Sequence, residues 1–483
     1  DGAQQWTYRQ WRDEVTRVAC GLQNIGLVQD DHLVSVLQNR QEAATLHMAC
    51  QLTGIVITPV NWRTTADQLN YVLADCDAVA LVYDNAARPV VEQTQAKADR
   101  THIDLDAPSP TSCWRQLLNT APHPIAPIDA NATSAMLYTS GTTGRGKGVP
   151  RSHAAERAAA IAHVAQNQYG WHEVTLGVMP LYHTMGVRSL LASILMNGHF
   201  VCQRRFDPLE ALALIERFQI TNLYLVPTLY HDLVHHEKFS ANRAMSVRKL
   251  GFAGQSMTDG LLQHLNSVFA PQLFVNHYGS SEIYTFTVEY NAARKPGSAG
   301  KAGINQEIRV VPIGSCDPEE HAPKGTEGQI IASLLGDEAF EGYWRRPESN
   351  AAALIDDWYF TGDIGYLDQE DDLFVTGRVD DMIISGGENI LPVEIESVLS
   401  LHDAVAEVAV AGLPNERWGQ TVTAFVTCHH PVTGAELNNW CLESGLVPFK
   451  RPRQYVFVTE LPKSPVGKLL RRKLIAGDYQ TID

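Results

Sequence analysis

Residues 138–148 read YTSGTTGRGKG, and this segment says more about the fold than any other part of the sequence. Its hydroxyl side chains can donate hydrogen bonds to phosphate oxygens. Its glycines permit positive φ and let backbone N–H groups approach an anion closely. Lys147 adds a point charge that can follow a β- or γ-phosphate. Together these features predict a phosphate-binding loop.

The flanks of this loop indicate an α/β fold. Ala135–Tyr138 has the pattern of a strand, and Ala154–Ala165 has that of a helix. A loop between a strand and a helix is where α/β folds bind phosphates. It is not a Walker A loop, because Lys147 is followed by Gly148. A flexible surface loop is the simpler alternative, but clustered hydroxyls, spaced glycines and a terminal lysine rarely coincide by chance.

The chain on both sides of the loop alternates helical and strand patterns. Helices are predicted at Tyr8–Ile25, Gln41–Gly54, Thr65–Ala74 and Leu261–Phe269, and strands at His32–Gln38, Ile55–Val60 and Gln272–His277. Repeated strand–helix units predict mostly parallel sheets covered by helices. We therefore expect an α/β fold whose large N-terminal domain contains mixed and parallel sheets.

The second half of the chain changes character. Residues 328–376 are rich in short strands and turns, which predicts a small β-barrel-like subdomain. A compact α+β unit follows, with helices at Pro392–Leu399 and Thr433–Glu443 and strands at Val405–Leu413 and Thr421–His429. The predicted division is an N-terminal domain at 1–377, a hinge at 378–381 and a small mobile C-terminal domain at 382–483.

Composition limits the partners. A chain of 483 residues is too long for one ordinary core, and its net charge of −16 disfavours nucleic acid and anionic lipid. Its most apolar stretches, such as Ala78–Tyr83, are far shorter than the ~20 residues that span a bilayer. We therefore expect neither a nucleic-acid nor a membrane partner. Basic residues gather only after residue 449, where eight of them stand against three acidic ones.

The cysteines indicate a reducing compartment. The eight cysteines are scattered and form no C-x-x-C pair, which favours reduced thiols over disulfides or a zinc site. With no signal peptide or lipidation motif in view, a cytoplasmic protein is expected. The chain begins at Asp1 without Met, so we expect that an N-terminal segment is missing.

Four further segments follow the loop: NHYGSSE at 276–282, WYFTGD at 358–363, GRVDDMI running on to GGENI at 377–390, and PVGK at 465–468. With the loop, they resemble the adenylate-forming superfamily of acyl- and aryl-CoA ligases, luciferases and peptide-synthetase adenylation domains. The 4-chlorobenzoate–CoA ligase branch is the most similar, through MPLYH at 179–183, RWGQ at 417–420 and FKRP at 449–452. Gly146 stands where the superfamily usually has proline, so we expect a more mobile but still active loop.

The resemblance implies an ATP-dependent ligase that forms an acyl-adenylate and passes the acyl group to coenzyme A. ATP and Mg²⁺ are the implied cofactors, and coenzyme A is the co-substrate. Because the first step joins two anions, charge neutralisation and positioning should carry most of the catalysis. Lys468 would bridge the carboxylate and the α-phosphate, Glu282 would hold Mg²⁺, and His183 is the third implied catalytic residue.

The resemblance also implies the nucleotide site. Asp363 would accept hydrogen bonds from the ribose hydroxyls, Arg378 would contact ribose or phosphate, and Tyr278 would stack on adenine. The other implied nucleotide-binding residues are Thr139, Ser140, Gly141, Thr142, Thr143, Gly144, Lys147, Gly254, Asn276, Gly279, Ser280 and Ser281. Each of these residues could instead have no role in catalysis: Lys468 could be a solvated surface lysine, Glu282 a salt-bridged surface residue and Asp363 the cap of a turn.

The C-terminal unit carries the implied coenzyme A residues. Asp380 resembles the hinge residue about which the small domain rotates between two catalytic arrangements. Trp418, Phe449, Arg451 and Arg453 would meet the nucleotide end of coenzyme A by stacking and phosphate pairing. An exposed basic patch explains each of these four residues equally well when it is taken alone.

The implied acid pocket consists of His183, Thr184, Met185, Tyr224, Ala253, His277, Gly279, Tyr284 and Thr285. Thr184, His277 and Tyr284 replace apolar residues of the 4-chlorobenzoate branch. A buried polar group without a partner costs roughly 1–3 kcal/mol, so we expect substrate heteroatoms or water beside them. Arg188 could read a second anionic group, although a position on the helix surface is the favoured reading. The expected substrate is a small aromatic or heteroaromatic acid, rather than chlorobenzoate or a long-chain fatty acid.

Three alternatives stay open at this point. An aryl-acid adenylating enzyme that loads a carrier-protein phosphopantetheine shares every ATP motif, and a ligase for medium-chain aliphatic acids differs only in its pocket. A catalytically silent nucleotide-binding protein is disfavoured by the presence of Lys468, Glu282 and Asp363. Partners are otherwise small molecules, and a homodimer is left open.

Overall fold

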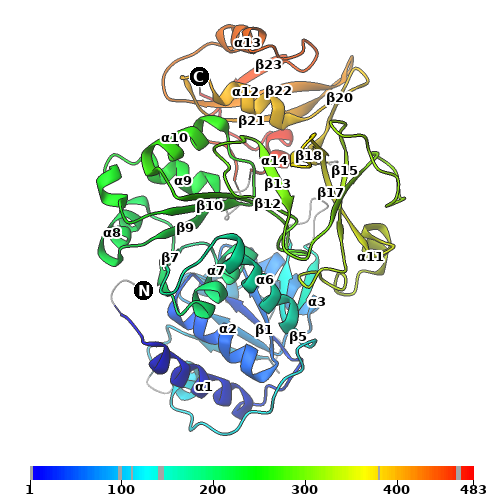
Figure 1. The fold of residues 1–483 in the computed structure, drawn as a ribbon. Coiled ribbons are helices and arrows are strands. Elements are labelled where there is room, and N and C mark those ends of the chain that lie inside the picture. The colour runs from blue at the N-terminus through cyan, green and yellow to red at the C-terminus, as the bar shows by residue number, and fades with distance from the viewer. Residues whose placement is uncertain are drawn as a thin grey trace.

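The computed structural model describes residues 4–95, 100–109, 112–139, 146–378, 381–463 and 469–482. Within these residues the chain forms three sheets, and the expected α/β class is confirmed (Figure 1). The first sheet has the order β4-β3-β1-β2-β5-β6 and is parallel except for β6, which runs antiparallel to β5. Its strands are β1 (His32–Val36), β2 (Val56–Val60), β3 (Ala80–Tyr83), β4 (Thr101–Asp104), β5 (Thr133–Tyr138) and β6 (Gly148–Ser152).

Local capping explains where the helices of this layer begin and end. The helices are α1 (Tyr8–Asn24), α2 (Gln41–Thr53), α3 (Ala66–Asp75), α4 (Arg88–Val91) and α5 (Cys113–Leu118). Thr7 and Thr65 each accept a hydrogen bond from a backbone N–H of the first turn, while a glutamine side chain returns to the cap. Gly54 ends α2 in the left-handed conformation, with φ of 72°.

The second sheet begins with parallel strands in the order β8-β7-β9-β10-β11. These are β7 (Val174–Gly177), β8 (His199–Cys202), β9 (Asn222–Leu225), β10 (Lys249–Ala253) and β11 (Leu273–Tyr278). The associated helices are α6 (His153–Gln166), α7 (Thr184–Leu195), α8 (Pro208–Phe218), α9 (Pro227–Val234), the 3₁₀ helix Ala241–Ala244 and α10 (Asp259–Phe269). Helix α6 packs on β5 and β6, α7 packs on β7 and β8, and the two helices pack together between the sheets (Figure 1).

Antiparallel strands continue the second sheet and form its β-rich part. They are β12 (Thr287–Glu289), β13 (Ser298–Ala302), β14 (Ile308–Val311), β15 (Gly328–Ser333), β16 (Leu354–Ile355), β17 (Trp358–Leu367) and β18 (Leu373–Arg378), with helix α11 (Pro347–Ala353). The subdomain expected from residues 328–376 is therefore hydrogen-bonded in continuity with the parallel strands, through β11 and β12.

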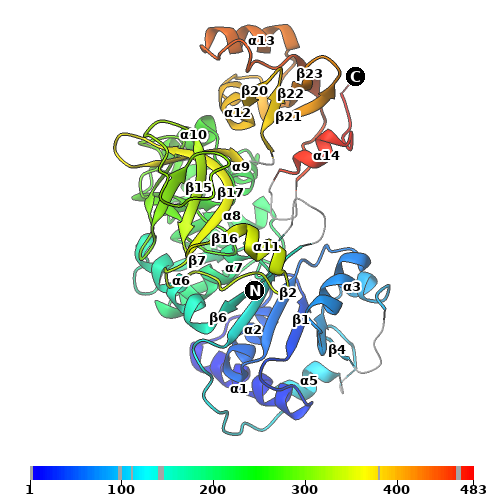
Figure 2. The ribbon, with the colours of Figure 1, turned by 90° about the vertical axis from the view of Figure 1, so that its right-hand side faces the viewer.

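The C-terminal unit has its own sheet, in the order β20-β19-β22-β21 with β23 parallel to β22. Its elements are β19 (Ile383–Ser385), β20 (Glu388–Ile390), α12 (Pro392–Ser400), β21 (Val405–Asn415), β22 (Gly419–Cys428), α13 (Gly434–Glu443), β23 (Gln454–Phe457) and α14 (Arg471–Ile475). The unit has hydrophobic clusters of its own. It lies against α10 and β18 through α12 (Figures 1 and 2).

The structure differs from the sequence prediction at the glycine-rich loop. The predicted helices and strands lie within about two residues of their observed bounds, but β6 separates the loop from α6. Because β6 runs back along β5, the N-terminus of α6 lies at the opposite end of the hairpin from the loop. The loop is thus a hairpin connection, and the dipole of α6 does not point at it.

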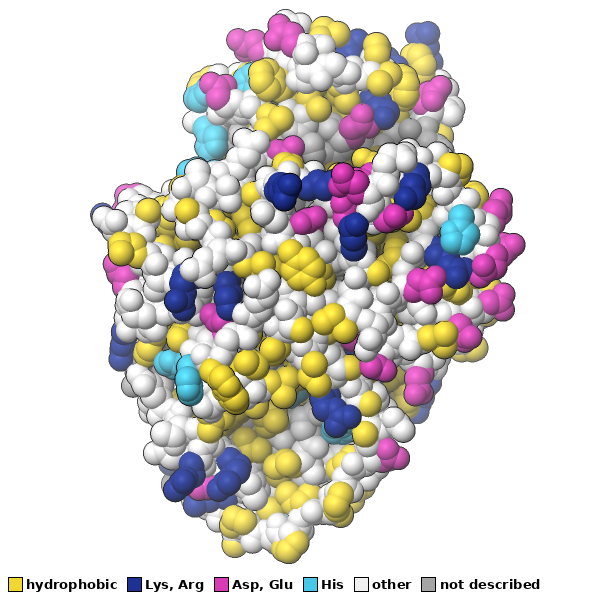
Figure 3. All heavy atoms as spheres, in the orientation of Figure 1, with side chains coloured by type: hydrophobic (Ala, Val, Ile, Leu, Met, Phe, Trp, Pro, Cys, Tyr) yellow, Lys and Arg dark blue, Asp and Glu magenta, His cyan; other side chains and the backbone are white. Residues whose placement is uncertain are grey.

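The face in Figure 3 mixes both signs of charge, with basic and acidic side chains side by side. A group of paired charges surrounds Lys295, whose Nζ lies 2.6 Å from Asp368 Oδ2 and 3.0 Å from Glu370 Oε2 and also pairs with Asp372. These three carboxylates are close enough together to hold a metal ion, but all three already pair with the ammonium of Lys295. No helix among the described residues has the length and apolar character needed to cross a membrane.

Candidate active site

The predicted nucleotide residues meet where β11 ends and β17 pairs with β18. Tyr278 donates a hydrogen bond of 2.6 Å to Oδ2 of Asp363. Asp363 lies opposite Arg378 in the β17–β18 ladder, and Nε of Arg378 is 3.0 Å from Oδ1 of Asp363. Gly362, the residue before Asp363, adopts the left-handed backbone conformation, with φ of 75°, which glycine accommodates without strain. Three residues from three separate strands thus form one polar group.

Burial sets the protonation state of Tyr278. It raises the pKa of the phenol well above its ordinary value, and the neighbouring carboxylate of Asp363 adds to this effect. Tyr278 therefore keeps its proton at neutral pH and can only donate to Asp363. This leaves the carboxylate with acceptor capacity for further donors.

Glu282 and Lys147 both contact Tyr343, an aromatic residue that the sequence analysis missed. Glu282 is only 6% exposed, and its Oε1 accepts a hydrogen bond of 2.7 Å from the hydroxyl of Tyr343. Nζ of Lys147 lies 4.6 Å from the centroid of the Tyr343 ring. The surface reading of Glu282 is therefore wrong. The aromatic pair Tyr343 and Trp344, directly after Gly342, is the one sequence signal that could have pointed here.

The described ends of the glycine-rich loop are closed by backbone contacts. The N–H of Thr139 donates to the carbonyl of Lys147 at 3.0 Å, and the hydroxyl of Tyr71 donates to the carbonyl of Gly146 at 2.8 Å. A Cβ added at Gly146 would lie 2.4 Å from the carbonyl oxygen of Thr139. A side chain at position 146 would therefore clash where the two ends of the loop meet, which gives a structural reason for glycine in place of proline.

The turn after β11 fixes the position of Glu282. A Cβ added at Gly279 would lie 2.0 Å from the carbonyl oxygen of Tyr284, so only glycine fits there. Oγ of Ser280 accepts hydrogen bonds from the N–H groups of Glu282 at 3.2 Å and Ile283 at 3.4 Å. These bonds orient the turn that delivers the buried carboxylate.

The remaining described nucleotide residues lie at the same end of the second sheet. The side-chain amide of Asn276 donates a hydrogen bond of 2.7 Å to the carbonyl of Ser298 and so stabilises the start of β13. Gly254 follows β10 directly with φ of 88°, and Ser281 lies half-buried in the turn before Glu282. Seven predicted residues lie outside the described part of the chain: Ser140, Gly141, Thr142, Thr143, Gly144, Asp380 and Lys468.

The predicted acid-pocket residues gather at the ends of β9, β10 and β11 and at the start of α7. Tyr224 belongs to β9, Ala253 ends β10, His277 lies near the end of β11, and Tyr284 and Thr285 follow in the next loop. His183 caps α7, its Nδ1 accepting from the N–H of Met185 at 3.4 Å. Thr184, Met185, Tyr224, Ala253, His277, Tyr284 and Thr285 are all buried.

Arg188 is buried, so its reading as a helix-surface residue is wrong. It is 3% exposed, and its Nη2 donates to the hydroxyl of Tyr224 at 2.7 Å. Its Nη1 donates to the carbonyl of Tyr284 at 2.9 Å and to Oγ1 of Thr285 at 3.3 Å. The signal was available in the sequence, because Arg188 follows Thr184 by four residues and shares its helical face.

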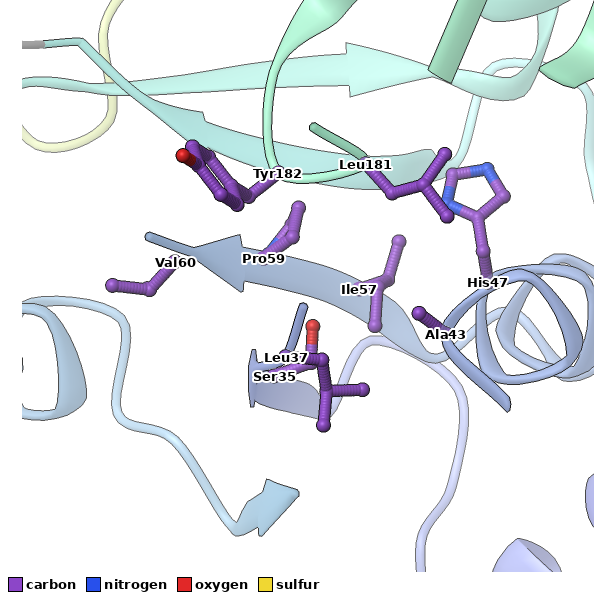
Figure 4. Close-up of a pocket in the computed structure, with 9 residues that line it drawn as sticks. All are labelled: Ser35, Leu37, Ala43, His47, Ile57, Pro59, Val60, Leu181 and Tyr182. Carbon is purple, nitrogen blue, oxygen red and sulfur yellow. The ribbon is translucent and has the colours of Figure 1, made fainter. Parts of the chain in front are cut away.

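A small cavity lies under the segment that leads to His183 (Figure 4). Leu181 and Tyr182 lie on one side of it, Ile57 of β2 on the other, and His47 of α2 at one end. Burial lowers the pKa of His47 to about 4, so its imidazole is neutral at pH 7. The segment that carries His183 is thus seated on a largely apolar part of the first sheet.

The predicted coenzyme A residues form two neighbouring groups on the C-terminal unit. The guanidinium of Arg453 lies 4.1 Å from the centroid of the Trp418 ring, and Phe449 is 37% exposed. Arg451 donates to Oδ1 of Asn438 at 3.2 Å. Arg451 and Arg453 also line a cavity together with Gly434, Asn438, Pro448, Pro452 and Tyr455.

The basic stretch after residue 449 is not one continuous patch. Four of its cations are paired with carboxylates: Lys450 with Glu394, Lys463 with Glu407, Arg471 with Glu396 and Asp381, and Lys473 with Asp478. Among the described residues, Arg451 and Arg453 have no such ion pair. Arg453 therefore contributes positive charge beside Trp418, together with Arg417, whose guanidinium lies 4.8 Å from the centroid of the same ring.

Comparison with known proteins agrees with this geometry. Residues 1–344 match the family described as AMP-binding enzyme, and residues 394–468 match the AMP-binding enzyme C-terminal domain. The chain is 32% identical over 482 residues to 4-chlorobenzoate–CoA ligase of Arthrobacter sp, covering 97% of this chain and 89% of the relative. It is 31% identical to fatty acid–[acyl-carrier-protein] ligase ScoC of Streptomyces coeruleorubidus, with 97% and 91% covered. The crystal structure of ATP-bound MatB from Rhodopseudomonas palustris superposes with a TM-score of 0.89 at 28% identity, over 97% of this chain and 93% of MatB.

The fold and the site define an adenylate-forming enzyme. The chain belongs to the AMP-binding enzyme family. Within that family it is a carboxylic acid–CoA ligase of the AMP-forming type, which uses ATP and coenzyme A.

Proposed function

We propose that this ligase activates a small aromatic or heteroaromatic carboxylic acid. The observation that carries the proposal is the packing of the acid pocket. Tyr224 lies with its ring centroid 6.1 Å from that of His277, and both side chains are about 1% exposed. Arg188 ties Tyr224 to the Tyr284 backbone. Aromatic and charged side chains packed in this way favour a flat ring as substrate and obstruct a long acyl chain.

In the first half-reaction, a carboxylate oxygen of the acid attacks the α-phosphate of ATP. The bond from that phosphorus to the bridging oxygen breaks, and pyrophosphate leaves with its electron pair. Lys468 neutralises charge between the carboxylate and the α-phosphate, while Asp363, Arg378 and Tyr278 hold the nucleoside. His183 closes the acid side of the site at the N-terminus of α7.

Glu282 fits the role of Mg²⁺ ligand. Its carboxylate is buried, and Tyr343, whose ring lies 4.6 Å from Nζ of Lys147, orients it by a hydrogen bond to Oε1. A hard divalent cation prefers such oxygen donors together with phosphate oxygens. When bound, Mg²⁺ would neutralise the phosphates and assist the departure of pyrophosphate.

In the second half-reaction, the sulfur of coenzyme A attacks the acyl carbon, the thiol proton is lost, and AMP leaves. We propose that the unit at 382–483 rotates about the hinge at 378–381 between the two steps, relative to the domain at 1–377. The support is topological, since β18 ends at Arg378 and β19 begins a separate sheet at Ile383. Trp418, Phe449, Arg451 and Arg453 would bind the nucleotide end of coenzyme A, whereas a carrier protein would not need Arg451 and Arg453.

Two variants separate the half-reactions. Lys468→Ala should abolish adenylation and largely spare thioester formation from supplied acyl-adenylate. Asp380→Pro fixes φ at the hinge and should allow adenylate formation while slowing transfer to coenzyme A. Equal loss of both half-reactions in Lys468→Ala, or unchanged rates in Asp380→Pro, would contradict these assignments.

Pyrophosphate release across a panel of acids tests the substrate class. Aromatic and heteroaromatic acids of benzoate, hydroxybenzoate or furoate size should give the highest kcat/KM, and medium-chain aliphatic acids should give less. Coenzyme A and a phosphopantetheinylated carrier protein are compared as acceptors. Preference for an aliphatic acid or for the carrier protein would favour the corresponding alternative. Gel filtration tests the homodimer, and fractionation of cells tests the proposed cytoplasmic location, which agrees with eight free cysteines.

A further inference from the structure

Arg188 is a buried cation without an ion pair. It lies on α7, one turn beyond the residues that begin the acid pocket, and is 3% exposed. Within the described part of the chain, no carboxylate oxygen lies within 4.0 Å of its guanidinium. By contrast, the neighbouring buried Arg151 is paired with Glu156 at 3.0 Å. A buried charge that lacks a counter-charge is strongly disfavoured, so Arg188 needs an explanation.

The contacts of Arg188 direct it to the acid pocket. Its Nη1 and Nη2 donate to Tyr284, Thr285 and Tyr224, all of them pocket residues. These are neutral acceptors, namely one carbonyl and two hydroxyls. Its Nε has no hydrogen-bond acceptor among the described residues. The guanidinium is therefore positioned by three bonds and retains donor capacity of its own.

The histidine beside it does not supply the missing negative charge. His277 is 1% exposed, and its Nε2 lies 2.9 Å from Oγ1 of Thr285. Burial lowers its pKa far below the ordinary value, and the charge of Arg188 acts in the same direction, so the ring is neutral. Its Nδ1 has no partner within the described residues, which gives the pocket a second unpaired polar atom.

Glu338, a buried acid whose pKa is influenced by the charge of Arg188, is biased towards its neutral form. Glu338 is 5% exposed, and neither carboxylate oxygen has a hydrogen-bond partner in the described parts of the chain. Burial raises its pKa, although the charges of Arg188 and Arg151 and the nearby donor groups of Thr285 oppose the rise. A second anion in the pocket would raise this pKa further, and a protonated Glu338 could then donate a hydrogen bond.

We propose that Arg188 binds a second anionic group of the acid substrate, on the side of the ring away from the reacting carboxylate. The preferred substrates are then aromatic acids that carry a second carboxylate or a similar anionic oxygen group. Nε of Arg188 and Nδ1 of His277 supply the polar contacts. This inference rests on the proposed function, because it assigns a substrate class to the same pocket.

The test compares acids that differ only in charge at the far position. 4-Carboxybenzoate and its neutral amide, 4-carbamoylbenzoate, have nearly the same shape, and the 3-substituted pair tests the other ring position. In the wild type, the better pair should show kcat/KM for pyrophosphate release roughly 100-fold higher with the carboxylate than with the amide. Benzoate and 4-hydroxybenzoate complete the panel.

Variants assign this selectivity to Arg188. Arg188→Gln should reduce the carboxylate-to-amide ratio to about one, and Arg188→Lys should retain part of it, because the charge remains. Arg157→Gln, an exposed arginine on the neighbouring α6, should leave the ratio unchanged. If Arg188→Gln fails to fold, Thr285→Val, which removes one contact of Arg188, should still lower the ratio.

The outcomes separate this inference from the proposed function. Equal rates with the carboxylate and the amide in the wild type would overturn the role of Arg188 while leaving aromatic-acid ligation intact. A loss in Arg188→Gln that is the same for every acid would make Arg188 only a positioning residue for the 284–285 segment. Absence of pyrophosphate release with all aromatic acids would instead refute the proposed function.

Discussion

The hydroxyl of Tyr278 and the carboxylate of Asp363 are joined by a hydrogen bond of 2.6 Å, although 85 residues separate them in the chain. Each belongs to a different sequence motif, and neither motif indicates that the two side chains are in contact. The bond means that a residue expected to stack on adenine also orients the residue expected to bind the ribose. The two assignments are therefore coupled.

Removing the Tyr278 hydroxyl should weaken nucleotide binding. In Tyr278→Phe the ring remains, but Asp363 loses its donor. Since Asp363 is partly exposed, we expect a loss of roughly 1 kcal/mol, or about a five-fold increase in KM for ATP. Tyr366→Phe, which removes a hydroxyl elsewhere on β17, is the matched control. An unchanged KM for ATP in Tyr278→Phe would mean that this hydrogen bond does not support the nucleotide site.

The hydroxyl of Tyr343 contacts Glu282 and its ring contacts Lys147, so two substitutions can separate the two effects. Tyr343→Phe removes the 2.7 Å hydrogen bond to Glu282 but keeps the ring that lies 4.6 Å from Lys147. We expect Tyr343→Phe to raise the Mg²⁺ concentration needed for half-maximal adenylation. Tyr343→Leu should in addition raise KM for ATP, because the cation–π contact also disappears. Titrations with Mg²⁺ and with ATP measure the two effects. Identical behaviour of the two variants would show that the ring makes no separate contribution.

The buried histidines should make the fold sensitive to mild acid. Burial lowers the pKa of His47 and that of His32 to about 4, whereas an unfolded histidine titrates near 6.5. Above pH 6.5 neither state binds the proton, so stability is unaffected. Between pH 6.5 and about 4 the unfolded state takes up protons that the folded state cannot, so stability falls as pH falls. The full effect is roughly 3 kcal/mol for each residue.

Thermal unfolding of variants measures this slope. His47→Leu should flatten the decrease in Tm between pH 6.5 and 4, whatever its effect on Tm at pH 7. His321→Gln, at an exposed position, should keep the wild-type slope. If both variants retain the same slope as the wild type, His47 is not among the groups that drive acid unfolding.

Sequence reasoning succeeded where neighbouring residues in the chain act together. The segments around Tyr278 and Asp363 are contiguous motifs, and the structure brings those residues into contact. The strand β6 was not predicted, because Pro150 and Arg151 are unfavourable in a buried strand. In the structure β6 lies at the edge of the sheet, where proline is tolerated. The charge of Arg151 is paired with Glu156. Sequence reasoning missed Tyr343 because tertiary packing alone brings that ring to Glu282.

Arg451 and Arg453 should recognise the 3′-phosphate of coenzyme A. They lack carboxylate partners among the described residues, while Lys450, Lys463, Arg471 and Lys473 are all paired. Arg453 is also held against Trp418, which restricts where its charge can lie. The double variant Arg451→Ala/Arg453→Ala should therefore raise KM for coenzyme A while leaving KM for ATP and for the acid nearly unchanged. Exposed ion pairs contribute roughly 0–1 kcal/mol each, so both changes are needed for a clear effect.

Dephospho-coenzyme A provides the internal control, because it lacks only the 3′-phosphate. The wild type should discriminate against it, and the double variant should discriminate much less. Arg472→Ala, an exposed cation from the same basic stretch, should behave as the wild type with both acceptors. Raising the salt concentration should weaken the wild-type preference and leave the variant almost unaffected, because the lost interaction is electrostatic. If the wild type and the double variant discriminate equally, these arginines do not read the phosphate, and the carrier-protein alternative gains support.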